Sequence, residues 1–96
     1  MTAKFKGEDT FIIRGRGLVL SGWIIEGSLR VGMALSIEGF PRTLTINGVE
    51  FIHTEPHIKG LIGLLFLSTD PQEITLWKEL DVKDKIVSVV ETEIPS

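Results

Sequence analysis

The chain has 96 residues, 43% of them hydrophobic and 24% charged, with a formal net charge of −3. This length fits one folded domain spanning residues 1–96, and the hydrophobic content excludes an intrinsically disordered chain. The absence of cysteine excludes disulfides, thiol chemistry and thiolate-bound zinc. The weakly acidic charge gives no overall attraction to nucleic acid or to an anionic membrane.

The start of the chain, MTAKFKGEDTF, lacks the apolar core of a signal peptide. The longest apolar run, LIGLLFL at residues 61–67, is far too short to span a bilayer as a helix. We therefore expect a soluble, cytoplasmic protein that binds no membrane. Glu8 and Asp9 lie among the basic residues near the start, which indicates a solvated surface rather than a basic stripe.

Short runs of β-branched and aromatic residues, separated by glycines, dominate the chain and indicate an all-β domain. The predicted strands cover residues 9–14, 17–26, 32–38, 42–52, 60–67 and 85–94. The Asn47-Gly48 pair is compatible with a hairpin turn. The apolar residues on both sides of it favour one bent strand with a bulge instead.

One segment, STDPQEITLWKEL, departs from the strand pattern. Pro71 stands at a suitable first position of a helix, and Glu73 falls in its first turn. Apolar residues recur there at helical spacing: Ile74, Trp77 and Leu80. We predict one short helix near residues 70–80 that crosses the barrel.

The order of the glycines gives a more specific signal. A phenylalanine is followed by a Gly-Arg-Gly corner, a glycine within the next strand and a Gly-x-x-x-x-Gly turn: Phe11, Gly15, Arg16, Gly17, Gly22, Gly27 and Gly32. With INGVE and GLLF further on, this stretch resembles the second domain of elongation factor Tu and related translation GTPases. The similarity covers about residues 8–66. VKDKIVSV also fits the family's last strand, with Asp84 where the family often has glycine.

The resemblance implies a closed antiparallel β-barrel, which in elongation factor Tu cradles the aminoacylated 3′ end of tRNA. Leu61 replaces the family's asparagine at one site position and removes its hydrogen bonding. A translation-related protein that contacts tRNA or the ribosome is therefore the alternative interpretation. Its binding residues would be Glu8, Phe11, Ile13, Arg14, Arg16, Glu50 and, as a partial match, His53.

Nucleotide, metal and catalytic sites are poorly supported by the sequence. A strand rather than a helix is predicted after Gly17, and no Gly-Lys-Ser or Gly-Lys-Thr occurs, so we expect no GTP and no cofactor. His53, Glu55 and His57 would share one face of an extended chain, and a metal-dependent function at His53 and His57 is the second alternative interpretation. Against it, Pro56 distorts the segment and no further Cys or His completes a closed zinc site. The scattered serines form no Gly-x-Ser-x-Gly elbow, and the charges of residues 73–85 indicate a solvated face, so we expect no enzyme.

The stretch SGWIIEG lacks the charged outer residues that the family usually has. If Ile24 is the buried residue of this strand, Trp23 and Ile25 point outward. LIGLLFL is likewise apolar on both faces, and such strands are covered on both sides. The cover could come from Trp77 and Leu80 of the helical segment, from a second copy or from another protein. The leading interpretation is a non-enzymatic adaptor with Trp23 and Ile25 as its protein interface.

Overall fold

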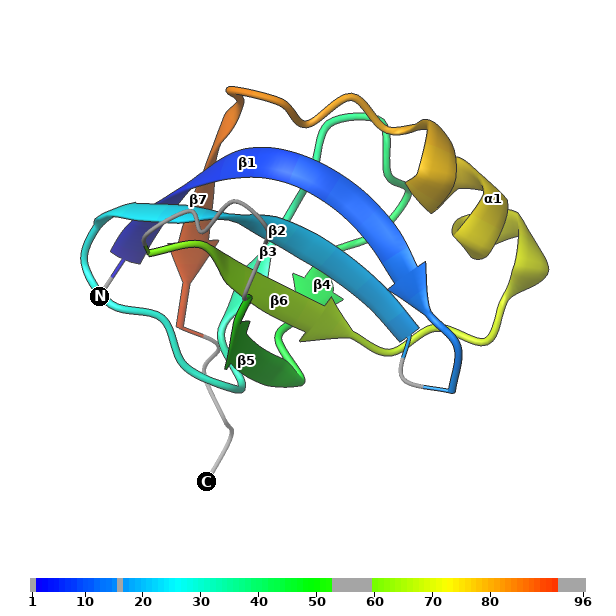
Figure 1. Ribbon diagram of the computed structural model, residues 1–96, viewed down its shortest axis with the longest axis horizontal. Coiled ribbons are helices and arrows are strands. Elements are labelled where there is room, and N and C mark those ends of the chain that lie inside the picture. The colour runs from blue at the N-terminus through cyan, green and yellow to red at the C-terminus, as the bar shows by residue number, and fades with distance from the viewer. Residues whose placement is uncertain (1, 16, 53–59, 92–96) are drawn as a thin grey trace.

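The framework of the protein is one seven-stranded antiparallel sheet, seen in a computed structural model that describes residues 2–15, 17–52 and 60–91 (Figure 1). The strand order is β4-β3-β7-β1-β2-β6-β5. The elements are β1 (Thr2–Ile13), β2 (Gly17–Glu26), β3 (Ala34–Leu35), β4 (Leu44–Thr45), β5 (Gly48–Phe51), β6 (Ile62–Phe66), α1 (Pro71–Glu79) and β7 (Ile86–Val90). The prediction of a mostly antiparallel β fold with one short helix is confirmed.

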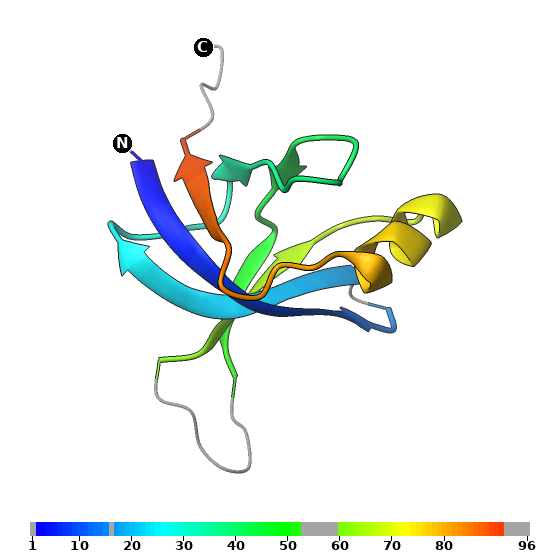
Figure 2. The ribbon, with the colours of Figure 1, turned by 90° about the horizontal axis from the view of Figure 1, so that it is seen from above.

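The sheet curls into a half-barrel that is open rather than closed, so the predicted closed barrel is wrong in that respect (Figure 2). Among the described strands, β4 and β5 form the two edges and do not pair with each other. Residues 46–47 connect β4 at one edge of the sheet to β5 at the other edge. The Ile46 N–H donates to the Met33 carbonyl (2.8 Å), and the Asn47 N–H donates to the Leu65 carbonyl (2.7 Å). No hairpin forms at Asn47-Gly48, as predicted. The predicted single bent strand with a bulge is wrong, because the residues before and after this pair form two separate strands, β4 and β5, on opposite edges of the sheet.

The corner between β1 and β2 is built by glycine, as predicted. Gly15 and Gly17 have φ values of 82° and 115°, which residues with a side chain rarely adopt. β1 begins at Thr2, seven residues before the predicted start. Buried and exposed residues alternate there, with Ala3 and Phe5 buried and Lys4 exposed. Two apolar residues among lysines are too short a pattern to predict a strand from the sequence.

Helix α1 starts where the sequence predicts it. The Asp70 carboxylate accepts a hydrogen bond from the Gln72 N–H (2.9 Å), and Pro71 fills the first helical position, where no N–H is required. The helix then directs Trp77 into the end of the half-barrel, where its side chain is 0% exposed. Trp77, one of the candidate covers for the outside of the barrel, therefore does not cover it. Leu80, which was expected beside it there, is also packed against the core.

Trp77 is held by both its ring and its polar groups. Its ring makes edge-on contacts with Phe40 and Phe66, at centroid distances of 5.5 and 5.7 Å. Its indole N–H donates to the carbonyls of Phe11 and Val19, both at 3.1 Å, and the Thr10 hydroxyl donates to its backbone carbonyl at 2.8 Å. A buried indole needs such acceptors, and a cross-strand pair of β1 and β2 supplies them.

A second connection ties α1 to the chain that follows β3. The Glu73 carboxylate accepts from Arg42 Nε (2.6 Å), Arg42 Nη2 (2.9 Å) and the Ser68 hydroxyl (2.6 Å). The Arg42 hydrogen bonds, followed by the one from Ser68, lower the pKa of Glu73 from its ordinary 4.5 to about 2. The charge pattern of residues 73–85 had indicated a solvated face. For Glu73 this prediction is wrong, because its carboxylate is held by Arg42 and Ser68.

Truncation of Trp77 should be severe. We expect Trp77→Ala to lower the free energy of unfolding by roughly 3–5 kcal/mol, because it removes the aromatic contacts and leaves a cavity. Trp77→Phe, which loses only part of the ring and the N–H donor, should cost less. The measurement is urea unfolding, with Leu76→Ala on the exposed side of α1 as the control. A Trp77→Ala protein as stable as the Leu76→Ala control would contradict this account.

The Glu73 interaction predicts a specific pH dependence. Because the folded pKa of about 2 lies below the ordinary 4.5, this carboxylate stabilises the fold above pH 4.5 and loses the effect as pH falls toward 2. Glu73→Gln should cost roughly 1 kcal/mol at pH 7, since the pair is partly screened, and less at low pH. Urea unfolding at pH 7, 4 and 2.5 would measure this, with Glu79→Gln as the control. An equal loss at all three pH values would refute the assignment.

Candidate protein-interaction surface

The second half of β2 is shaped by two irregularities in its pairing with β1. Gly7 pairs with Gly22 and Asp9 with Ser21, so Glu8 is an extra residue on β1. A Cβ on Gly22 would lie 2.0 Å from the Lys6 carbonyl oxygen, which requires glycine at this position. The predicted bulge at Gly22 is thus confirmed, although its extra residue is Glu8 on the facing strand.

The second irregularity exposes the apolar end of β2. Phe5 pairs with Ile24 and Lys4 with Glu26, so Ile25 is an extra residue opposite no single partner. Ile25 is 48% exposed, as predicted for an outward residue, whereas Trp23 is half-buried. Ile24 was predicted to be buried but is 41% exposed. It lies opposite core residue Phe5, near the strand end, where the core no longer covers it.

Exposed apolar residues of β7 continue this surface across the sheet. Lys6 of β1 pairs with Trp23 on one side and with Ile86 on the other, which places these three residues in one row. Ile86 is 58% exposed and Val90 42%. We call Trp23, Ile25, Ile86 and Val90 the open-end face. The sequence analysis missed its β7 members, although the alternation in KIVSVV was a usable signal.

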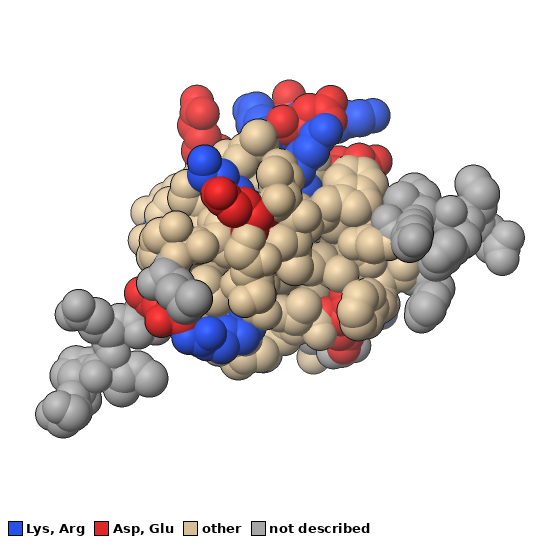
Figure 3. Space-filling model, turned by 90° about the vertical axis from the view of Figure 1, so that its left-hand side faces the viewer, with Lys and Arg blue, Asp and Glu red and all other residues tan. Residues whose placement is uncertain are grey.

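The charges within the open-end face are paired. Lys4 lies 3.9 Å from the Glu26 carboxylate, and Lys6 lies 3.5 Å from that of Asp84. The view toward this end of the molecule shows a broad uncharged area with acidic and basic groups around it (Figure 3). Lys4 and Lys6 thus lie between the apolar residues of β2 and β7, and apolar side chains among paired charges are suited to contact with another protein.

The chain covers one of its two doubly apolar strands but not the other. Every residue of β6 is buried, and Val19 and Ile52 lie over Gly63, within 3.2 Å of where its Cβ would stand. The end of β2 has no such cover from the helix. Helix α1 lies beside the opposite end of β1 and β2 (Figure 1), so the helical segment, one of the three candidate covers, does not cover Trp23 and Ile25.

The alternative RNA-binding residues are only partly brought together. Phe11 and Ile13 are partly exposed on β1, and Arg14 is exposed in the corner that follows. Glu50 lies on β5, separated from β1 by β2 and β6, which is roughly 14 Å at the usual strand spacing. Glu8 is the extra residue described above, and Leu61 is buried. Arg16 and His53 lie outside the described residues.

The candidate metal ligands His53, Glu55 and His57 also lie outside the described residues. Within the described ranges, no group of three or more His, Cys, Asp or Glu residues could hold a metal ion. The single helix in the described part of the chain is neither long nor apolar enough to cross a membrane. A scan against models of known protein families gives no match.

The close approach at Gly22 generates a stability prediction. Gly22→Ala should lower the free energy of unfolding by roughly 3 kcal/mol or more, because the new methyl group would meet backbone and a packed ring. Gly15→Ala is the control: its φ of 82° is unsuited to alanine, but its side chain would meet open space, so about 1 kcal/mol is expected. Equal losses in urea unfolding would contradict the close packing of β1 and β2 at Gly22.

Proposed function

We propose that this protein is a non-enzymatic, cytoplasmic binding module that associates through its open-end face with another protein chain. The chain it binds is either a second copy or a different protein. The observation that carries the proposal is the exposure of Ile25 and Ile86 on two strands that flank β1, beside the half-buried Trp23. Tryptophan is a typical anchor residue of protein interfaces.

The position of α1 supports this proposal. A small all-β domain that needed only to be stable would gain by covering its apolar strand ends. Here the helix and its one buried aromatic residue are used at the opposite end of the half-barrel. The open-end face is left for contact with another chain.

We also propose kinship with the second domain of elongation factor Tu and related translation GTPases. Two backbone features support it. The Gly15 and Gly17 corner has the positive φ values that such a Gly-Arg-Gly sequence serves. Asp84 has a φ of 63° and is the one non-glycine residue in the described ranges with a positive φ. Asp84 stands where the family often has glycine, and a backbone position with positive φ favours glycine.

The interface is tested by the double variant Trp23→Arg with Ile25→Glu. Sedimentation velocity over a wide concentration range should show loss of association, with circular dichroism still reporting a folded protein. Thr75→Arg with Leu76→Glu is the matched control, since it makes the same charge changes on the exposed side of α1. If the wild type is monomeric, the same pair of variants is compared by cross-linking in cell extract. Undiminished association of the Trp23 variant would refute the proposal.

The RNA-binding alternative gives a different result in the same experiments. Phosphate contacts release counterions, so affinity for tRNA would fall steeply as salt is added. An association through the open-end face should change little with salt, because its contacts are apolar and its charges are already paired. A steep salt dependence would favour the tRNA or ribosome interpretation.

A further inference from the structure

Strand β7 has one open edge. β1 pairs with it along its whole length, from Ile86 to Val90, but β3 pairs with it only at Val89 and Val90. In continued register Ser36 would lie opposite Ser88, yet the chain turns away there. The Phe40 N–H donates to the Ile37 carbonyl (3.0 Å), and this turn carries Phe40 onto Trp77.

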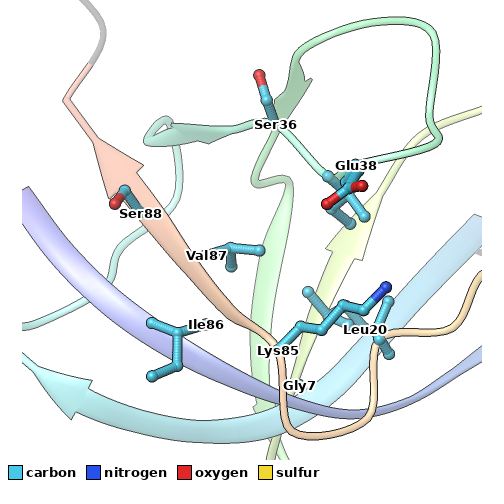
Figure 4. Close-up of a pocket in the computed structure, with 10 residues that line it drawn as sticks. Gly7, Leu20, Ser36, Glu38, Lys85, Ile86, Val87 and Ser88 are labelled. Atoms are coloured by element: carbon cyan, nitrogen blue, oxygen red, sulfur yellow. The ribbon is translucent and has the colours of Figure 1, made fainter.

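The departure of the chain from β7 leaves a cleft of about 430 Å³ between residues 36–38 and residues 85–88 (Figure 4). Its inner lining is apolar, with contributions from Leu20, Val82 and Val87. Its rim carries Glu38 and Lys85, which come from opposite walls. The size is that of a small ligand site, but one wall is a strand with an unpaired edge.

The direction of the backbone groups along this edge can be derived. The Lys85 carbonyl accepts a hydrogen bond from the Gly7 N–H of β1 (2.8 Å), so it points toward β1. Because backbone groups alternate along an antiparallel strand, those of Val87 and Val89 also point toward β1. The N–H and C=O groups of Ile86 and Ser88 then face the cleft. Within the described residues, the pairing of β3 with β7 includes Val89 and Val90 but none of residues 86–88.

An extended peptide fits this cleft better than a folded copy of the chain. A row of unpaired N–H and C=O groups is matched by another strand, and such strand addition is a common mode of peptide recognition. The open stretch of three residues spans roughly 10 Å, enough for a short segment. Strand β7 of a second copy could not enter, because it lies between its own β1 and β3.

We propose that the cleft binds one extended peptide segment of another protein, added as a strand along β7 where β3 stops. The peptide backbone pairs with Ile86 and Ser88, and one of its aliphatic side chains occupies the apolar lining at Leu20 and Val82. This site adjoins the open-end face and shares Ile86 with it, but it uses the backbone of Ile86. It does not require the side chains of Trp23 or Ile25.

The experiment uses a phage library of random heptapeptides selected on the full chain. Enriched peptides should alternate β-branched or aliphatic residues with polar ones, and their binding is then measured by calorimetry. Ser88→Pro removes the N–H that faces the cleft while leaving the β1–β7 hydrogen bonds intact, as proline permits at an open edge. Binding should weaken by about tenfold. The matched control Ser88→Thr keeps the N–H and should bind as the wild type does.

A second measurement keeps the test independent of any folding defect in Ser88→Pro. N-methylation of alternate peptide amides blocks their hydrogen bonds, and one of the two methylation registers should abolish binding to the unmodified protein. The Trp23→Arg with Ile25→Glu variant should bind the peptide normally, which separates this site from the proposed interface. Failure to enrich any peptide, or full binding by peptides methylated in the one register and by those methylated in the other, would overturn the proposal.

Discussion

Trp77 fixes the structure at one point on which the rest of the fold depends. A half-barrel of short strands leaves one end of its core unfilled, and this indole fills it from the helix. Its N–H reaches the carbonyls of Phe11 and Val19, so it is held by a cross-strand pair of β1 and β2. Its ring also contacts Phe40 and Phe66. The longest strand pair, β6 and the segment after β3 therefore all converge on one side chain.

The position of this residue also explains the two surfaces that the chain leaves open. Because Phe40 packs against Trp77, residues 36–38 leave β7, and β3 pairs with it over only two residues. The cleft along β7 follows from that departure. Because α1 is docked at this end, it does not cover Ile25 near the end of β2 or Ile86 at the start of β7, and both stay exposed. Both candidate binding surfaces are thus consequences of how the core is completed.

Local features of the fold could be predicted from the sequence, and long-range ones could not. Asp70, Pro71 and the corner glycines determine nearby backbone geometry, and the helix and the β1–β2 corner occur where they indicate. The burial of Trp77 depends on residues more than 50 positions away, so helical spacing alone gave the wrong face. The hydrogen bond of Arg42 to Glu73 also joins residues far apart in the sequence, so local pattern could not predict it. For the candidate interface, the outward position of Ile25 could be predicted. The exposure of Ile24 could not, because it depends on the pairing register of β2 with β1, which the apolar sequence pattern does not specify.

The most direct test of this account is hydrogen exchange of the free wild-type protein, followed by NMR at single amides and at the Trp77 indole. The account predicts that the indole N–H exchanges as slowly as core amides such as that of Leu64. It predicts that the amides of Ile86 and Ser88 exchange much faster than those of Val87 and Val89, because they face the cleft. A rapidly exchanging indole, or uniform protection along β7, would contradict it.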